Sequence, residues 1–226
     1  MADGANGAGT AAPDCRTLLE RLGAHYGPLH WWPAETPFEV MVGAVLTQNT
    51  AWTNVERALA ALREADALTP AGMAALEPGE LAERIRPSGY YNVKADRLRH
   101  LLAFLERMGG IEGLSALETG PLREALLGVK GIGPETADDI VLYAFHRPVF
   151  VVDAYTRRLF ERLGRPHARD GYETLRASVE AELGADTAAF NELHALIVEH
   201  GKQRCRPRPL CEGCPLANRC YGVVMD

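Results

Sequence analysis

Four of the five cysteines fall within the last 22 residues of the chain, as Cys205, Cys211, Cys214 and Cys220. The spacing is Cys-x5-Cys-x2-Cys-x5-Cys. A disulfide framework is disfavoured because the chain starts without an export signal. Four thiolates on one short loop suit either a tetrahedral zinc ion or a [4Fe–4S] cluster. The spacing therefore predicts a metal centre and leaves its identity open between these two.

Two other groups of residues could carry chemistry. Trp31 and Trp32 are adjacent, and paired indoles can line a site for a flat ring or serve as ordinary packing. Asp153 stands directly before a helix pattern, the usual position of an N-cap, and a cap would hold its carboxylate in a fixed direction. The residues alone leave structural and functional interpretations open at both places.

A glycine-rich hairpin between two helix patterns spans residues 121–145. Pro121 opens the first pattern, and Pro134 opens the second at the first helical position, which suits proline. The glycines let the backbone approach another molecule, and the start of the second helix presents free N–H groups that suit a phosphate. A glycine turn also joins ordinary helix pairs, so the pattern alone leaves DNA binding open. The glycines are Gly128, Gly131 and Gly133.

The other elements that must position these residues also read as helices. Apolar periodicity predicts helices at about 15–26, 38–50 and from Trp52 onward, and another whose core face carries Leu98 and Leu105. Thr69 and Pro70 form a helix-start signal. The Gln48–Asn49 pair between two helices is, by itself, more typical of a cap or turn. No strand pattern of any length occurs, so we expect an all-α protein, with a disordered Gly/Ala-rich tail at residues 1–12.

The totals limit the class of protein. A length of 226 residues allows one large domain or two small ones. The net charge of −6 counts only weakly against a nucleic-acid partner, because a local basic face is enough for binding. Basic residues gather between residues 84 and 99 and between 202 and 208. No apolar run approaches the roughly 18 residues of a membrane span, so we expect a cytoplasmic protein without a membrane partner.

Several of these segments resemble the endonuclease III superfamily of DNA glycosylases. Residues 129–137, Val-Lys-Gly-Ile-Gly-Pro-Glu-Thr-Ala, resemble its helix–hairpin–helix, and residues 146–153 fit the Gly/Pro loop that leads to the family's aspartate. The Gly-x-Tyr-Asn-x-Lys-Ala pattern at residues 89–95 resembles a loop that suits a phosphate contact. The cysteine pattern is similar to the family's C-terminal iron–sulfur loop, with a first gap of five residues instead of six.

The resemblance implies a two-lobed, all-α helix–hairpin–helix glycosylase fold with a [4Fe–4S] loop at residues 205–220. Residues 36–146 would form a helical barrel domain, and residues 13–35 with 147–226 the second lobe. Asp153 would be the catalytic carboxylate, which stabilises positive charge on the sugar and orients a water. Gln48 or Asn49 would fill the gap left by the extruded base. The remaining DNA contacts would be Lys94, Lys130, Gly131, Gly133 and Thr136.

Glu135, which the resemblance places at the base pocket, marks a departure within that family. Bifunctional members have a lysine at this place, and a glutamate cannot form the Schiff base that drives strand cleavage. We therefore expect a monofunctional glycosylase without an intrinsic lyase step, and we do not expect nearby Lys130 to substitute. Adenine-mismatch relatives need a glutamate near Gly43 and Ala44, where this sequence is apolar.

Residues 29–202 most resemble the 3-methyladenine DNA glycosylase III branch. In that branch, aromatic residues at the positions of Trp31, Trp32 and Trp52 stack on the damaged base, and a cationic methylpurine favours such a stack. Lys202 matches a branch lysine near the pocket that can be carbamylated, with an ordinary surface lysine as the alternative. The expected partner is duplex DNA with a damaged base, bound by a monomer. The competing functions are a uracil/thymine-mismatch or oxidised-pyrimidine glycosylase and a non-catalytic DNA-binding paralogue.

Overall fold

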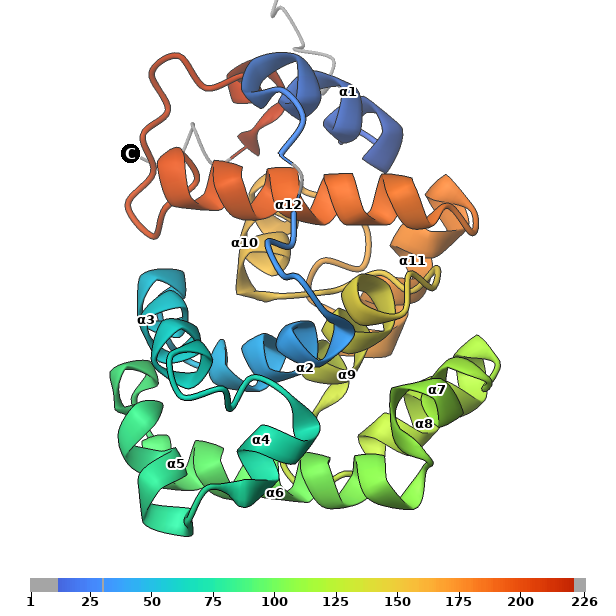
Figure 1. The fold of residues 1–226 in the computed structure, drawn as a ribbon. Coiled ribbons are helices and arrows are strands. Elements are labelled where there is room, and N and C mark those ends of the chain that lie inside the picture. The colour runs from blue at the N-terminus through green and yellow to red at the C-terminus, as the bar shows by residue number, and fades with distance from the viewer. Residues whose placement is uncertain (1–11, 30, 222–226) are drawn as a thin grey trace, which may run out of the picture. The chain divides into compact units, whose positions relative to one another are not determined.

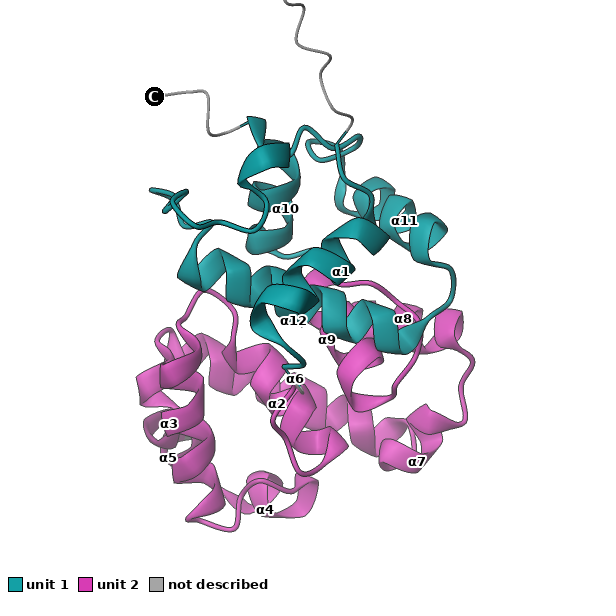
Figure 2. Cartoon of the chain, turned by 90° about the horizontal axis from the view of Figure 1, so that it is seen from above, with its two compact units in different colours: residues 1–31, 152–226 teal, residues 32–151 magenta. Residues whose placement is uncertain are grey.

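The computed structural model describes residues 12–29 and 31–221, which lie in two compact units. The tail expected at residues 1–12 lies outside this part of the chain except for Ala12. Unit 1 contains residues from both ends of the chain, up to Trp31 and from Val152, whereas unit 2 is the continuous segment 32–151 (Figures 1 and 2). Every regular element in the described residues is helical, which confirms the all-α prediction.

Unit 1 is built around one long helix, α12 (Thr187–Gln203), whose buried face includes Phe190, Leu193 and Ile197. Helix α1 (Cys15–Tyr26), predicted with these same bounds, packs on α12 and on α11 (Tyr172–Leu183), and α10 (Ala154–Arg162) packs on α12. A short 3-10 helix, η3 (Ala217–Arg219), follows in the cysteine loop. Aspartates cap three of the four α-helices in this unit: Asp14, Asp153 and Asp186.

Unit 2 surrounds helix α2 (Pro37–Leu46), in which every residue from Phe38 to Leu46 is buried. Apart from Glu39, which pairs with Arg63, this helix is apolar on all sides, as expected of a core helix, and α2 contacts α3, α6, α9 and η2. Thr36 caps it by accepting from the Glu39 backbone N–H, and Pro37 occupies the first helical position. The other helices are α3 (Trp52–Arg63), α4 (Pro70–Ala75), α5 (Pro78–Arg84), η1 (Arg86–Ser88), α6 (Tyr91–Arg107), α7 (Gly110–Ser115), α8 (Thr119–Leu127), α9 (Pro134–Asp139) and η2 (Ile140–Ala144).

The second helix of the hairpin differs from the regular helix that its apolar periodicity predicts. It begins at Pro134 as expected, but after Asp139 it continues as a π-helix, η2. All five residues of η2 are buried, and it packs against α2. A wider turn is uncommon and often accompanies functional sites. Here it follows the hairpin directly and carries Tyr143 into the core of unit 2.

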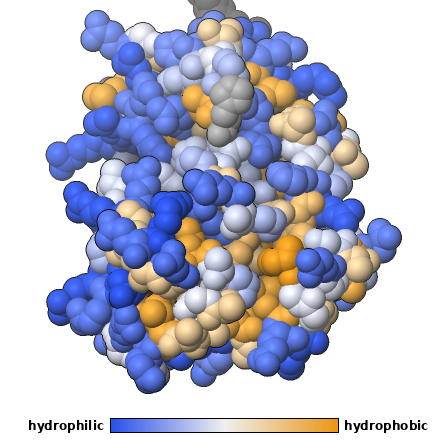
Figure 3. Space-filling model, in the orientation of Figure 1, coloured by the Kyte–Doolittle hydropathy of each residue, from blue (hydrophilic) through white to orange (hydrophobic). Residues whose placement is uncertain are grey.

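One face of the molecule displays both hydrophilic and apolar side chains (Figure 3). Hydrophilic side chains predominate on the face in Figure 3, with apolar ones interspersed. None of the described helices is both long enough and apolar enough to cross a membrane.

Candidate functional site

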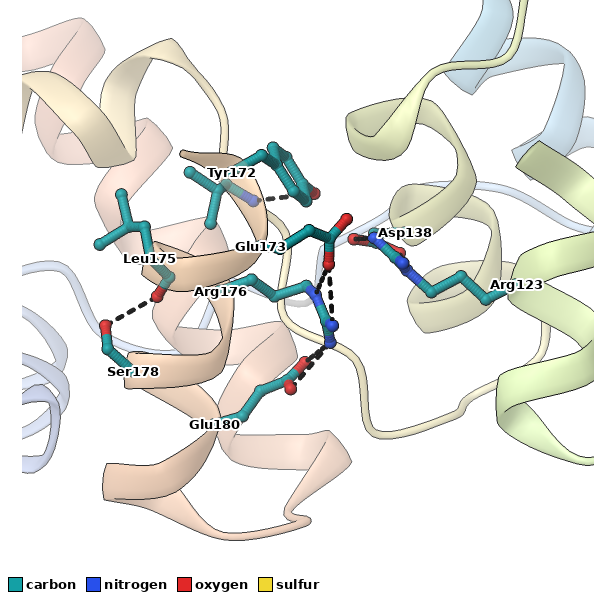
Figure 4. Close-up of polar contacts among 9 residues, drawn as sticks. Arg123, Asp138, Tyr172, Glu173, Leu175, Arg176, Ser178 and Glu180 are labelled. Carbon is teal, nitrogen blue, oxygen red and sulfur yellow. Dashed lines mark hydrogen bonds and ion pairs between the residues drawn. The ribbon is translucent and has the colours of Figure 1, made fainter. Parts of the chain in front are cut away.

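Asp153 is held in place at the start of α10. Its Oδ1 accepts a hydrogen bond of 2.7 Å from the Thr156 backbone N–H, so it is the N-cap that the sequence indicated. His194 Nε2, from α12, lies 3.7 Å from Oδ2, and the Asp153 side chain is 12% exposed. The preceding backbone N–H, of Val152, donates to the hydroxyl of Tyr172 at 3.3 Å (Figure 4). The carboxylate thus has a fixed direction and a neighbouring histidine.

The electrostatics around Asp153 favour its ionised form. Burial raises the pKa of this carboxyl, but the interactions with His194 and the hydrogen bonds from Thr156 outweigh burial, so the pKa lies below its ordinary value. The group is therefore a carboxylate at neutral pH. A fixed, partly buried negative charge can stabilise a cation that develops close to it.

Trp32 and Trp52, two of the three predicted pocket tryptophans, meet within unit 2. Their ring centroids are 5.1 Å apart at an interplanar angle of 90°, and Trp32 also lies 5.2 Å from the ring of Tyr143. Gly43 packs closely against Trp32, because a Cβ at that position would lie 3.1 Å from Trp32 Cζ2 and the ring would have to shift by a few tenths of an ångström. Trp52 Nε1 donates to Glu56 Oε1 at 2.9 Å. The result is an edge-to-face aromatic group, a geometry that aromatic pairs prefer.

Trp31 and Lys202 form a separate pair within unit 1. The Lys202 ammonium lies 4.8 Å from the centre of the Trp31 ring, within the range of a cation–π contact. The predicted pocket residues therefore fall into two groups, one in each unit. Their joint role in one pocket stays a prediction.

The two helices that flank the hairpin of unit 2 are joined by an ion pair, and part of the hairpin itself is exposed to solvent. Arg123 of α8 forms two hydrogen bonds with the fully buried Asp138 of α9, at 2.5 and 3.1 Å, which ties together the two helices that flank it (Figure 4). Lys130, Gly133 and Glu135 are exposed. Gly131 has φ +96°, a conformation that favours glycine. The hairpin therefore presents a rigid backbone with one lysine and one glutamate at its surface.

Gln48 and Asn49, the two candidates for the stack-filling residue, have different surroundings in the turn at residues 47–50. Gln48 Nε2 donates to Gly131 O at 3.1 Å and to Thr136 Oγ1 at 2.8 Å, and Thr136 is 5% exposed. Asn49 is exposed, and its backbone has φ +54°. Asparagine tolerates this left-handed conformation better than most residues. Of the two, Asn49 is the residue that points away from the protein.

Lys94, expected to contact a phosphate, has two protein partners instead. Its ammonium is buried and donates to Leu46 O and to Ser88 O, each at 2.7 Å. Burial, with a smaller contribution from the charge of Arg97, lowers the pKa of Lys94 to about 8. Lys94 thereby joins the end of α2 to the loop before α6, and a phosphate contact by this residue stays a prediction.

Tyr90 is a functional candidate that the sequence did not reveal. It is 75% exposed, and its backbone lies in the left-handed region, at φ +47°. A strained conformation that displays a large aromatic side chain is typical of a contact site. Because Lys94 bonds the carbonyls of Leu46 and Ser88, the segments that carry Asn49 and Tyr90 are braced against each other. A positive φ at a non-glycine residue leaves no trace in sequence periodicity.

The four C-terminal cysteines line one cavity in unit 1, of about 20 Å³. None of them forms a disulfide. The apolar side chains that line the cavity include Leu159, Leu210 and Leu216. Arg162 Nη1 donates a hydrogen bond to Cys205 Sγ at 3.2 Å. In the part of the chain that the structure describes, no three His, Cys, Asp or Glu side chains converge in the arrangement of a metal site. The four thiols are the type of donor that a sulfur-ligated group needs, and such a group at this loop stays a prediction.

Comparisons with known proteins agree with this arrangement. A sequence model of HhH-GPD superfamily base excision DNA repair proteins matches residues 42–183. The chain is 46% identical over 199 residues to a Methanocaldococcus jannaschii protein provisionally named a DNA repair glycosylase, over 87% of this chain and 90% of that protein. It is 33% identical over 186 residues to endonuclease III of Thermotoga maritima, over 81% of this chain and 82% of that protein.

Two solved structures share the fold. The H. pylori 3-methyladenine DNA glycosylase bound to 1,N6-ethenoadenine matches with a TM-score of 0.73 and 32% identity, over 84% of this chain and 98% of that one. A non-covalent endonuclease III–DNA complex matches with a TM-score of 0.78 and 24% identity, over 92% of this chain and 94% of that one. On the family model and the identity to full-length relatives, the chain belongs to the HhH-GPD superfamily of base excision DNA repair proteins.

Proposed function

We propose that this protein is a monofunctional DNA glycosylase of base excision repair that hydrolyses the N-glycosidic bond of alkylated purines such as 3-methyladenine. The observation that carries the substrate class is the edge-to-face pair of Trp32 and Trp52, for which Gly43 leaves room. An N-methylated purine is a flat cation, and indole rings attract cations more strongly than neutral bases. The 32% identity to the H. pylori 3-methyladenine DNA glycosylase supports the same substrate class.

Asp153 would supply the catalytic charge. As the bond between C1′ and the base nitrogen breaks, positive charge develops on the sugar, and a carboxylate that is already ionised stabilises it without prior proton loss. Water then adds to C1′ and loses a proton, and the base departs with the bonding electrons. A cationic methylpurine leaves as a neutral base, so little acid catalysis is needed. Residues 40–46, which include Gly43, are apolar, and Glu39, the glutamate of α2, is paired with Arg63, which agrees with this.

The parts of the protein that contact DNA would be the hairpin and two exposed residues, Asn49 and Tyr90. Exposed Lys130 and the backbone of Gly131 and Gly133 suit phosphate contacts. Asn49 would enter the gap left by the extruded base, and Tyr90 offers an exposed ring for stacking on a neighbouring base. The partner would be duplex DNA containing a damaged base, bound by a monomer at the cytoplasmic nucleoid.

We infer that the enzyme lacks lyase activity. Lysine is the side chain whose amine can form a Schiff base, and the chain contains three lysines. Lys94 is buried on two backbone carbonyls, and Lys202 lies over Trp31. Lys130 is exposed on the hairpin, but Glu135 occupies the place of the lysine found in bifunctional relatives. The expected product is therefore an intact strand with an abasic site.

Cys205, Cys211, Cys214 and Cys220 would hold a [4Fe–4S] cluster. Their thiolates are the ligands that such clusters require, and all four line the same apolar cavity. Bound there, the cluster would supply a cross-link between distant points of the loop. Arg162 would support the loop directly, since it donates to Arg206 O at 2.7 Å and to Pro207 O at 2.9 Å.

The test uses methylated duplex DNA in single-turnover reactions. Released bases are separated and counted, and strand breaks are measured with and without later alkali. Free methyladenine with breaks only after alkali is the expected result. Breaks without alkali would overturn the monofunctional assignment. Uracil-containing and oxidised-pyrimidine duplexes serve as comparison substrates: their preferential excision would move the enzyme to the endonuclease III-like alternative, and tight binding without release of any base would favour a non-catalytic paralogue.

A further inference from the structure

The Gln48 side chain is fully engaged by the protein. Both hydrogens of its amide nitrogen have acceptors, Gly131 O and Thr136 Oγ1, and its amide oxygen accepts from Nη1 of Arg97. The orientation of the amide follows from the chemistry, because a backbone carbonyl only accepts and a guanidinium only donates. Gln48 would have to break three hydrogen bonds before it could enter a DNA stack.

Arg97 reaches Gln48 by crossing Gly131. An added Cβ at Gly131 would lie 2.4 Å from Arg97 Cγ and 2.9 Å from Cδ, so the arginine stem rests directly on the bare backbone of the hairpin. The guanidinium then meets the Gln48 amide from the other side. Three segments that are distant in the sequence, the turn at 47–50, helix α6 and the hairpin, therefore meet at one side chain.

Asn49 follows Gln48 directly, with left-handed backbone. That conformation costs free energy in a non-glycine residue and persists only when neighbouring contacts hold it. In the same turn, the backbone N–H of Thr50, the residue after Asn49, donates to Thr47 O at 3.2 Å. The hydrogen bonds of Gln48 with Gly131, Thr136 and Arg97 join this turn to residues that are distant in the sequence.

We propose that Gln48 and Arg97 form a latch that fastens the turn at residues 47–50 to the hairpin and so presents Asn49 to DNA in a preset direction. This inference rests on the proposed function, because it takes Asn49 as the residue that enters the stack. Gln48 and Arg97 are then positioning residues, and neither contacts DNA. The latch also couples the two DNA-reading segments of unit 2, so that a shift of the hairpin is transmitted to the turn.

Three variants separate the parts of the latch. Arg97→Met keeps the stem over Gly131 and removes the guanidinium. Gln48→Glu leaves an acceptor for Arg97 but loses both donations to the hairpin and places a carboxylate against Gly131 O. Arg97→Lys keeps a charge and one donor, and should restore part of the wild-type behaviour. Arg107→Met is the matched control, because it removes an exposed charge from the same helix, where Arg107 bonds only within α6.

The first measurement is hydrogen exchange in the free protein. Arg97→Met and Gln48→Glu should each speed exchange at the amides of Thr50 and Ile132, whose turn bonds lie on the two sides of the latch. Arg107→Met should leave both unchanged. Unchanged exchange in the latch variants would overturn the latch whatever the protein does to DNA.

The second measurement is the preference for a duplex with a tetrahydrofuran abasic site over an undamaged duplex. Gln48→Glu should lose on the order of tenfold of that preference, since it gives up two hydrogen bonds, and Arg97→Met, which gives up one, should lose roughly threefold. In an Asn49→Ala background, the same changes should cost nothing further. If the latch changes lowered the abasic preference in the Asn49→Ala background as much as in the wild type, Gln48 or Arg97 would act on DNA directly and the proposal would be overturned. A decrease in the salt dependence of DNA binding by about one phosphate contact would have the same meaning. The wild type could show no preference for the abasic duplex while the variants still show faster hydrogen exchange. That pair of results would refute the proposed function and the presentation of Asn49 to DNA, but the connection between the turn and the hairpin would stand.

Discussion

Replacing Asp153 with asparagine separates the charge of this residue from its structural role. Asparagine is as good an N-cap as aspartate, so Asp153→Asn keeps an acceptor for the Thr156 backbone N–H. The charge-assisted bond becomes a neutral one, which costs about 1 kcal/mol of folding stability. The lost charge costs far more in catalysis. With an effective dielectric constant near 20 for a partly buried carboxylate, its attraction to a sugar cation about 4 Å away is about 4 kcal/mol.

That energy corresponds to roughly a thousandfold slower base release. The assay is single-turnover release from methylated duplex, with thermal melting of both proteins. Asp14→Asn is the matched control: Asp14 caps α1 through a bond of the same 2.7 Å and also has a lowered pKa, but it lies at the exposed start of α1. It should leave release unchanged. Release by Asp153→Asn within tenfold of wild type, with normal melting, would mean that Asp153 is only a cap.

The acid dependence of stability should follow the same residue. The folded pKa of Asp153 lies below its ordinary value, so its contribution is present above the unfolded pKa, about 3.9, and is lost as the pH falls through the folded pKa. The stability difference between wild type and Asp153→Asn should therefore disappear under strongly acidic conditions. Denaturant melts from neutral to acidic pH measure it, and a difference that persists unchanged at the acid end would contradict the assignment.

Three further predictions concern other parts of the molecule. Trp52→Ala should lower release of cationic methyladenine about tenfold more than release of neutral hypoxanthine, since a desolvated cation–π contact is worth roughly 1–2 kcal/mol; equal losses for both bases would place the stacking elsewhere. The pKa of Lys94 is about 8 in the folded protein and about 10.4 in the unfolded chain, so between these two pH values the unfolded chain binds more protons. The free energy of unfolding of the wild type should therefore rise with pH in this range relative to that of Lys94→Met. Parallel pH profiles of the two proteins in urea melts would argue against this. Protein purified without oxygen should contain iron and sulfide and absorb broadly in the visible, and Cys214→Ser should lose that absorbance; a colourless, zinc-loaded wild type would rule the cluster out.

Local chemistry made much of the fold predictable. Proline at the first helical position and a threonine before it define the start of α4, where Thr69 accepts from the Gly72 N–H as its position indicated. The apolar positions Val55, Leu59 and Leu62 lie buried along α3. These signals depend on neighbours within one or two turns of helix, which is the range that a sequence pattern can report.

The features that escaped prediction depend on long-range contacts. Gln48 looks like a turn residue until its partners 83 and 88 residues away are known. The π-helix that carries Tyr143 has the apolar residues of an ordinary buried helix. His194 does leave a signal, because it sits among the apolar residues of α12 one turn after Phe190. A lone histidine on a core face is more often structural, however, and only its 3.7 Å distance from Asp153 makes it part of the site.

The division of the chain between the two units has a consequence for its synthesis. Unit 2 is one uninterrupted segment, whereas α1 belongs to unit 1 and is held by partners that are made much later. The Cys15 N–H donates to Glu182, 167 residues downstream, and Pro13 O accepts from Arg165. At about 5–20 residues per second, α1 must wait roughly 10–30 s for these partners. During that interval its buried face, with Leu18 and Leu22, lacks α12, so we expect the nascent N-terminal helix to expose this apolar face until α12 has been made.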